Sequence, residues 1–386
     1  MKALGLIEII QRGEDSKHQF KENITNPESL AAEIVAFSNT EGGTIVLGVN
    51  DSGEIKGLSS DDTRRLNQLI SNTATNNVKN PINVITENVQ VDDKDVIVIE
   101  IEKGIDKPYF DNNGIIWVKN GSDKRKVTSK EELRRLFQSS DLVSSDKIPV
   151  EGTSLKDIDM EQLSKFYEKE YDESISTLEI NLITFLENSN LAKDGKLNFA
   201  GLLLFGKNPQ SFKPEFLIKA VSFVGNDNTG EEYRDSEDIT GNLGKQFISA
   251  ESFILRNLRK TQNGQSFNSL GELEIPRIVF QEILVNSLLH RNYFIASSIK
   301  IFIFDNRIEI ISPGTLPNSL TIENIKMGIS NFRNPVLVSF GTKLLPYRGI
   351  GTGIIRAIKN YPDIDFINDT DNNQFKVIIR RHESQR

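Results

Sequence analysis

The stretch that most constrains the fold of this chain is residues 139–154 (SSDLVSSDKIPVEGTS), which separates two longer segments with apolar patterning. Its Ser, Asp, Pro and Gly residues are typical of a linker. The chain has 386 residues, and a single hydrophobic core usually serves fewer. We therefore expect a first domain at residues 1–140, a linker at 141–154 and a second domain at 155–386.

Composition narrows the class of protein. The chain is 37% hydrophobic and 26% charged, as in ordinary globular proteins rather than disordered ones. It has no cysteine, which excludes disulfides, thiolate zinc sites and cysteine nucleophiles. No apolar run approaches the roughly 20 residues that cross a bilayer, and the N-terminus lacks the apolar core of a signal peptide. We expect a cytoplasmic protein with no membrane contact.

Both halves mix helix and strand signals, so we predict an α+β fold class. In the first half, a helix at 29–37 precedes strands at 44–49, 82–89, 96–101 and 115–119. In the second half, helical segments at 160–170 and 176–188 and a buried strand at 200–205 form an N-terminal extension. A long helix at 276–290, a strand pair at 298–304 and 307–311, a helix at 353–360 and a strand at 375–380 follow.

The long helix carries a polar stripe. Glu282, Asn286 and His290 are four residues apart, so they share one face beside apolar neighbours. A carboxylate and a carboxamide on adjacent turns suit a metal-dependent nucleotide site. Asn286 can offer its oxygen to Mg²⁺, and Glu282 can orient or deprotonate a water. The alternative is a solvated helix face that bears three polar groups by chance.

A glycine-rich loop precedes the helix at 353–360. Gly349, Gly351 and Gly353 alternate along it, which lets backbone N–H groups and the following helix N-terminus turn toward a phosphate. The pattern is not G-x-G-x-x-G, so a dinucleotide-binding fold fits poorly. A P-loop is excluded as well, because Gln246 follows Gly244-Lys245.

Between these elements a strand ends in the turn Ser312-Pro313-Gly314. The order of helix, strand, Pro-Gly turn and glycine loop resembles the gyrase/histidine-kinase/MutL (GHKL) ATPases, and in particular the RecG-like branch fused to Schlafen-type domains. Segments that read like that branch include Lys196–Pro209, His290-Arg291 with Tyr293, and Arg333-Asn334-Pro335.

This resemblance implies a Bergerat-type α/β sandwich that binds ATP and Mg²⁺. Glu282 would be the general base and Asn286 the Mg²⁺ ligand. The further ATP-binding positions would be His290, Arg291, Ser312, Pro313, Gly314, Gly349, Gly351, Thr352 and Gly353. The sequence departs from the family pattern in two ways. Arg348 stands where an acidic residue is expected, and no Asp-x-Gly-x-Gly adenine box is present. Phosphate binding is therefore better founded than adenine specificity.

The first half carries a second resemblance. Residues 13–21, the run Asn39-Thr-Glu-Gly-Gly with Leu-Gly-Val-x-Asp-x-Gly after it, and residues 107–122 are similar to the Schlafen-type AlbA-like (AlbA_2) domain. Such domains bind nucleic acid, and some cleave RNA with three carboxylates. The matching positions here are Glu14, Gln19 and Asp51. Because Gln19 is an amide and brings no charge to a metal, we predict binding without cleavage. Asp51 alone could also be a plain turn residue.

One basic cluster stands out in a chain whose net charge is −8. It comprises Lys119, Lys124, Arg125, Lys126, Lys130, Arg134 and Arg135. With Lys21, the members Lys119 and Lys124 to Lys126 are the candidate contacts to phosphate, or else a solvated face.

Three functions remain open at this stage. The first is a bacterial-type ATP-binding, nucleic-acid-binding regulator that acts in transcription control or anti-phage defence. The second is an ATP-regulated, metal-dependent nuclease, and the third is an inactive interaction protein on the same folds. Gln19 favours the first over the second, and Glu282 with Asn286 disfavours the third. The expected partners are DNA or RNA, a second copy in a homodimer or larger homo-oligomer, and proteins from the same operon.

Overall fold

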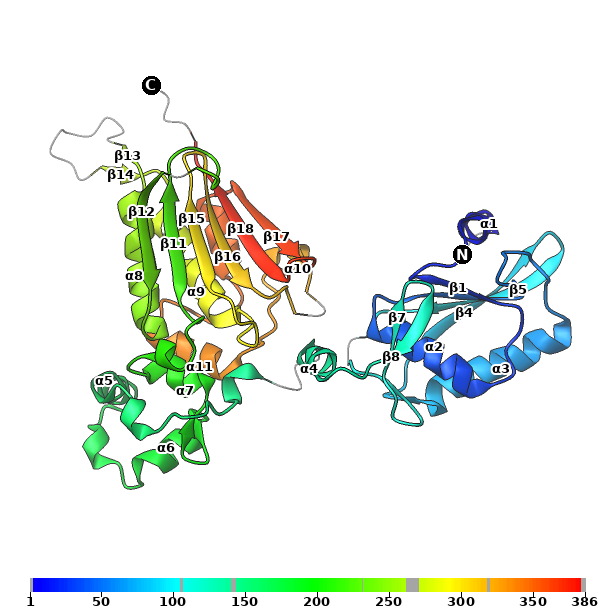
Figure 1. Cartoon of the computed structure of the whole chain (residues 1–386), viewed down its shortest axis with the longest axis horizontal. Coiled ribbons are helices and arrows are strands. Elements are labelled where there is room, and N and C mark those ends of the chain that lie inside the picture. The colour runs from blue at the N-terminus through cyan, green and yellow to red at the C-terminus, as the bar shows by residue number, and fades with distance from the viewer. Residues whose placement is uncertain are drawn as a thin grey trace. The chain divides into compact units, whose positions relative to one another are not determined.

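The computed structural model describes residues 3–104, 107–139, 144–230, 232–261, 271–317 and 320–382. The chain forms two compact units, Met1–Val143 and Ser144–Arg386 (Figure 1). Residues from Ser144 onward, which we expected in the linker, belong to the second unit. Ser145 and Asp146 are fully buried there, because Asp146 accepts hydrogen bonds from the backbone N–H groups of Val336 and Leu337.

The first unit is built on a four-stranded sheet in the order β1-β2-β5-β4. The strands are β1 (His18–Lys21), β2 (Gly43–Leu47), β4 (Val84–Val91) and β5 (Lys94–Ile101). Strand β1 runs parallel to β2, and the other pairs are antiparallel. Strands β2, β4 and β5 confirm the sequence expectation, with shifted ends, whereas β1 was not expected.

Both faces of strand β2 are buried. Ile45 and Leu47 of β2 pack with helices α2 (Pro27–Asn39) and α3 (Ser60–Asn76). Val46, which points to the opposite face, packs with α1 (Ala3–Arg12). Burial on both sides explains why β2 reads as a continuous apolar run rather than as an alternating one.

A small hairpin of β7 (Trp117–Asn120) and β8 (Asp123–Lys126) lies against α2. Asn39, at the end of α2, ties this region together: its Nδ2 donates to the carbonyls of Tyr109 and Trp117, and its Oδ1 accepts from the Tyr109 N–H. The remaining elements of the unit are β3 (Val78–Lys79), β6 (Phe110–Asp111) and α4 (Lys130–Ser139).

The second unit contains a six-stranded sheet in the order β12-β11-β15-β16-β18-β17. The strands are β11 (Ile218–Phe223), β12 (Tyr233–Ile239), β15 (Ile299–Ile303), β16 (Arg307–Pro313), β17 (Ile364–Asp369) and β18 (Gln374–Arg380). Only β11 and β15 pair in parallel. Helices α8 (Leu243–Asn257) and α9 (Arg277–His290) pack on the sheet (Figure 1). Helix α12 (Gly353–Asn360) packs against α9.

The expected strand at 200–205 is wrong, because these residues form helix α7 (Phe199–Phe205). The side chain of Asn198 caps the helix by accepting from the Gly201 N–H. All seven residues of α7 are buried. A short apolar run has no readable period when every side is covered, so its pattern alone could not separate a buried strand from a buried helix.

Smaller elements complete the second unit. They are α5 (Met160–Tyr171), α6 (Leu182–Asn188), α10 (Ile322–Lys326), α11 (Pro335–Leu344), the strand pairs β9 (Ala192–Lys193) with β10 (Lys196–Leu197) and β13 (Lys260–Thr261) with β14 (Glu272–Leu273), and the 3-10 turns Ser145–Lys147, Leu155–Asp157, Ile175–Thr177 and Pro209–Ser211. Within the described ranges, no helix has the length and apolar character needed to cross a membrane.

Candidate nucleotide and nucleic-acid sites

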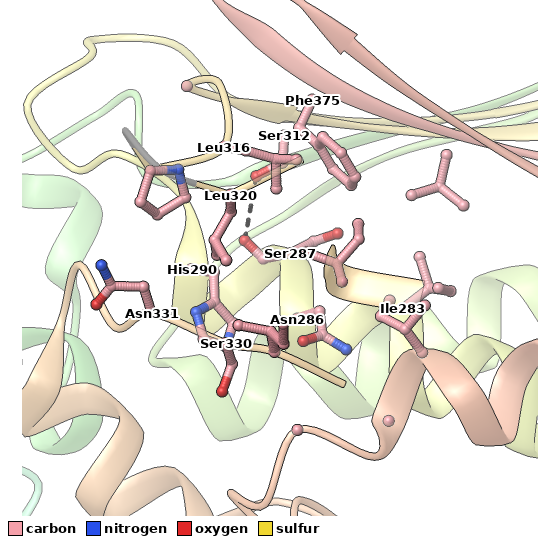
Figure 2. Close-up of a pocket in the computed structure, with 18 of the residues that line it drawn as sticks. Ile283, Asn286, Ser287, His290, Ser312, Leu316, Leu320, Ser330, Asn331 and Phe375 are labelled. Carbon is pink, nitrogen blue, oxygen red and sulfur yellow. Dashed lines mark hydrogen bonds between the residues drawn. The ribbon is translucent and has the colours of Figure 1, made fainter. Parts of the chain in front are cut away.

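A cavity of about 110 Å³ lies in the second unit, between α9, the end of β16 and the start of α12 (Figure 2). Its apolar wall includes Ile283, Leu316, Ile325, Ile354, Phe375 and Val377. Its polar wall includes Asn286, Ser287, His290 and Ser312, and the Ser312 hydroxyl donates to the Ser287 carbonyl. None of the described lining residues is Asp, Glu, Lys or Arg.

Helix α9 brings the polar stripe to this cavity. Its apolar residues are buried against the sheet and α8, so Glu282, Asn286 and His290 are left on the side toward α12. Asn286 and His290 line the cavity. The Asn286 Nδ2 donates to the Glu282 carbonyl at 2.6 Å, which leaves Oδ1 as the oxygen that can accept or coordinate.

Glu282 does not line the cavity, and its carboxylate is buried. Only 1% of the residue surface is exposed. Its Oε1 lies 2.6 Å from Nη2 of Arg356 in an ion pair. Beyond this ion pair, neither carboxylate oxygen has a hydrogen-bond partner among the described residues. Burial raises the pKa of Glu282, while the charges of Arg356 and Arg348 oppose that rise.

The glycine loop brings the start of α12 against this pair. A Cβ atom at Gly353 would lie 2.5 Å from Oε2 of Glu282 and 3.3 Å from Nδ2 of Asn286. Gly351 has a φ of +74°, and a Cβ there would collide with the backbone carbonyl of Gly328. Gly351 and Gly353 line the cavity, whereas Gly349 and Thr352 do not. Only glycine lets the helix N-terminus come this close to the Glu and Asn side chains.

The Pro-Gly turn forms another part of the wall. Ser312 and Gly314 line the cavity, and Pro313 does not, since it pairs within the sheet as the last residue of β16. Gly314 has a φ of +99°, and a Cβ there would lie 2.6 Å from the Cβ of Asn292. This glycine is therefore required by the turn itself.

His290 and Arg291 are neighbours with different environments. His290 lines the cavity, and its Nε2 lies 3.2 Å from the Tyr347 hydroxyl. Burial and the charge of Arg333 lower the pKa of His290 to about 4. Arg291 is buried away from the cavity: it donates to the carbonyls of Ile295 and Ser297 and stacks over the Tyr293 ring. The expectation that Arg291 contacts nucleotide is not supported by its position.

Several residues at this site were missed by sequence reasoning. Arg356, three positions after Gly353, was not identified as the partner of Glu282. Tyr347, Ser330 and Asn331 line the cavity from the segment before the glycine loop. Only the spacing of Arg356, one turn into a helix that begins at the glycine loop, could have indicated a role.

In the first unit, Glu14 and Gln19 form one hydrogen-bonded group. Oε1 of Glu14 accepts from Nε2 of Gln19 at 2.6 Å and from the Phe20 N–H at 2.7 Å. Oε1 of Gln19 accepts from Nζ of Lys119 at 2.7 Å. Burial lowers the pKa of Lys119, and the nearby carboxylates of Glu33 and Glu14 oppose that shift.

Asp51 lies apart from this group. Its side chain is 83% exposed, and its carboxylate is 3.6 Å from Nζ of Lys21. The turn that contains it is held by Asn50, whose Oδ1 accepts from the N–H groups of Ser52 and Glu54. In the part of the chain that the structure describes, no three His, Asp or Glu side chains form a group that could hold a metal ion.

The basic cluster is partly neutralised within the unit. Lys124 is paired with Glu33 at 2.6 Å, and Arg125 makes two hydrogen bonds to Glu132, at 2.7 and 2.9 Å. Lys126 is exposed, and its ammonium lies 5.3 Å from the centre of the Trp117 ring. Lys130 is also exposed. The side chains of Arg134 and Arg135 lie outside the described residues.

Models of known families match segments in both units of the chain. The model "Schlafen, AlbA_2" matches residues 14–128, and the model "Putative ATP-dependent DNA helicase recG C-terminal" matches residues 296–379. A third model, "Domain of unknown function (DUF8451)", matches residues 134–218. No curated protein matches the chain.

Two solved structures are similar to parts or all of the chain. The DIP2311 protein from Corynebacterium diphtheriae is 19% identical, covers 99% of this chain and 80% of its own, and has a TM-score of 0.46. The N-terminal domain of an ATP-dependent DNA helicase RecG-related protein from Nitrosomonas europaea is 18% identical, covers 34% of this chain and 96% of its own, and has a TM-score of 0.24.

The two assigned domains support DNA binding by the first unit and ATP binding by the second. The chain has the architecture of a Schlafen AlbA_2 domain fused to an ATPase-like domain of the RecG C-terminal family.

Proposed function

We propose that this chain binds and hydrolyses ATP in its second unit and binds nucleic acid through its first, so that the nucleotide regulates nucleic-acid binding. The observation that carries the proposal is the close approach of Glu282 to Asn286 and Gly353, two residues that line a largely apolar cavity. A base-binding wall, an acid-amide pair and a helix N-terminus are the three parts that a nucleotide site needs.

The cavity divides into two chemical regions. Ile283, Ile325 and Phe375 provide apolar surface for a planar base. The phosphates would lie toward Gly351 and Gly353, where the N-terminus of α12 offers backbone N–H groups and a partial positive charge.

The residues present fit a Mg²⁺ ion bound together with the phosphates. Asn286 would hold it through Oδ1, because Nδ2 is already engaged with the Glu282 carbonyl. The ion would neutralise charge on the transferring phosphoryl group. Glu282 has carboxylate oxygens without hydrogen-bond partners among the described residues, so it can accept a proton from an attacking water. Arg356 holds this carboxylate in place.

Base recognition would rest on hydroxyl and amide groups. The turn at Ser312 to Gly314 supplies no carboxylate, and the Ser312 hydroxyl already donates to the Ser287 carbonyl. A hydroxyl can both donate and accept, so selection for adenine would be weaker than selection for the triphosphate.

The first unit would contact phosphates through exposed cations around the β7–β8 hairpin, with Lys126 beside the Trp117 ring. For the biological role we propose a bacterial-type regulator in transcription control or anti-phage defence. We also propose self-association of the chain and assembly with proteins from the same operon. These roles rest on the combination of the two domains.

Calorimetric titration of the full chain with ATP and Mg²⁺, repeated with ADP, tests the proposal. Asn286→Ala should weaken Mg²⁺-dependent ATP binding, whereas Asn188→Ala, an exposed position on α6, should not. Phosphate release and nucleic-acid affinity with and without ATP complete the test. Absence of any Mg²⁺-dependent adenine-nucleotide binding at millimolar concentration would refute the ATPase assignment.

A further inference from the structure

The first unit contains a buried charged network around Lys119. We infer that the ammonium of Lys119 occupies the place where the Schlafen resemblance expects a divalent metal, and that this position therefore binds no divalent ion. The inference concerns the first unit alone and does not depend on the proposed nucleotide chemistry.

The surroundings of Lys119 are those of a bound cation. Its side chain is 2% exposed. Nζ donates to Oε1 of Gln19 at 2.7 Å and to the carbonyl of Ser122 at 2.5 Å. It also lies 4.8 Å from the centre of the Phe37 ring, over its face, and 3.9 Å from Oε2 of Glu33. Two oxygens, a carboxylate and an aromatic face thus surround one positive charge.

Two of the three positions where the resemblance expects carboxylates, Glu14 and Gln19, are already engaged in hydrogen bonds. Glu14 accepts from Gln19 and from the Phe20 N–H through the same oxygen. Gln19 links Glu14 to Lys119, since its Nε2 donates to Glu14 while its Oε1 accepts from Lys119. A glutamate at position 19 could not donate to Glu14, so the amide is the side chain that this arrangement requires.

The third expected carboxylate does not join the group. Asp51 is largely exposed and faces Lys21. The buried acid of the network is instead Glu33 on α2, which sequence reasoning did not select. Its Oε1 pairs with Lys124 at 2.6 Å, and its Oε2 has no hydrogen-bond partner among the described residues. The metal that the family resemblance implies therefore does not fit the residues present.

The charges of the network also disfavour a divalent metal ion. The network contains two carboxylates, Glu14 and Glu33, and two ammonium groups, Lys119 and Lys124. It is neutral without any added ion. A divalent cation at this position would add two positive charges beside a fixed ammonium, and like charges at such distances repel strongly where water is excluded.

Binding of Mn²⁺ alone, without nucleotide or nucleic acid, tests this inference. The free hexaaqua ion is counted by electron paramagnetic resonance in titrations of the full chain. We expect no bound Mn²⁺ at about 100 µM for the wild type and for Gln19→Glu, because Lys119 is still present, and about one bound ion for the double variant Gln19→Glu/Lys119→Met. The matched control Gln90→Glu/Lys79→Met makes the same charge change at two exposed positions and should bind none.

Three results would overturn the inference. The first is a bound ion in the wild type that disappears in Glu14→Gln. The second is a double variant that keeps the circular dichroism spectrum of the wild type and yet binds no Mn²⁺. The third, which serves if the double variant does not fold, is a bound ion in Lys119→Arg, because that variant retains the positive charge. Calorimetric ATP binding should be unchanged in every variant, so that loss of nucleotide binding is recognised separately.

Discussion

Arg356 and Glu282 form an ion pair across α12 and α9, with Nη2 and Oε1 2.6 Å apart. Because Glu282 is buried and Arg356 is partly exposed, the arginine is placed to hold the carboxylate beneath the start of α12. The carboxylate proposed as the general base is thus positioned by a residue from the helix that follows the glycine loop.

Replacement of Arg356 should separate catalysis from binding. We expect Arg356→Gln to lower kcat by about tenfold or more while the dissociation constant for ATP changes little, and Arg356→Lys to retain part of the rate. Removal of one partner from a buried pair also destabilises, by roughly 3–5 kcal/mol, so the unfolding midpoint must be measured alongside. A variant with normal kcat would show that the ion pair serves stability alone.

A methyl group at Gly353 should disrupt the nucleotide site. Its Cβ would lie 2.5 Å from Oε2 of Glu282, so Gly353→Ala must displace either the carboxylate or the helix. We expect Mg²⁺-dependent ATP binding to weaken by about tenfold or more, as measured by calorimetry. Gly244→Ala in α8 is the control, since a Cβ there has no neighbour closer than 3.6 Å. Equal affinities for the two variants would contradict the assigned site.

The pKa of His290 predicts how stability changes with pH. Its folded pKa, about 4, is below the unfolded value of about 6.5. The unfolded state therefore binds more protons between these values, and stability is lost as pH falls from about 6.5 toward 4. The loss at pH 5 should be up to about 2 kcal/mol. Denaturant midpoints at pH 7 and pH 5 should differ more for the wild type than for His290→Gln, and equal differences would contradict the prediction.

Sequence patterns predicted the parts of the fold and site that depend on local chemistry. Glu282, Asn286 and His290 share a helix face because helical geometry places every fourth residue there. The strands β15 and β16 turn at Asp305-Asn306 as expected. By contrast, the ion pair to Arg356 depends on how α12 packs on α9. That packing is tertiary, and no spacing within one element encodes it.

The first unit shows the same difference between what local sequence predicts and what tertiary packing decides. Gln19 was correctly noted as a departure from a carboxylate, but its partner Lys119 is 100 residues away in sequence. Lys119 and Lys124 looked like surface cations by composition, and the fold buries or pairs both with Glu33. Charge clusters in a sequence do not reveal which members are neutralised by acids from another helix.

We expect the wild type to leave nucleic acid intact. Labelled tRNA, single-stranded DNA and duplex DNA are incubated with the full chain and Mg²⁺ or Mn²⁺, with and without ATP. No cleavage should occur, because Lys119 and Gln19 stand where a metal with charged ligands would be needed. Cleavage by the wild type that Asp51→Ala abolishes would contradict this expectation. Cleavage gained by Gln19→Glu alone would show that the amide, rather than the ammonium of Lys119, is what prevents metal binding.

The salt dependence of nucleic-acid binding should depend mainly on Lys126. Each phosphate that a cation neutralises contributes roughly 0.9 to the slope of log K against log salt for duplex DNA. Lys124 and Arg125 are paired with Glu33 and Glu132, so they are less available to phosphates than Lys126, whose ammonium lies over Trp117. We expect Lys126→Ala to reduce the slope by up to about 0.9, and further replacement of Lys124 and Arg125 by Ala to add little.

Fluorescence anisotropy with duplex DNA at several salt concentrations measures these slopes, and Lys79→Ala, at an exposed position on β3, is the control. A slope reduction about three times larger in the triple variant than in Lys126→Ala would mean that both ion pairs open to meet phosphates. If neither variant changes the affinity or the slope, the cluster is a solvated face, and nucleic acid must bind the first unit elsewhere. Because Lys124 and Arg125 are already paired with acids, we expect the triple variant and Lys126→Ala to have nearly the same slope.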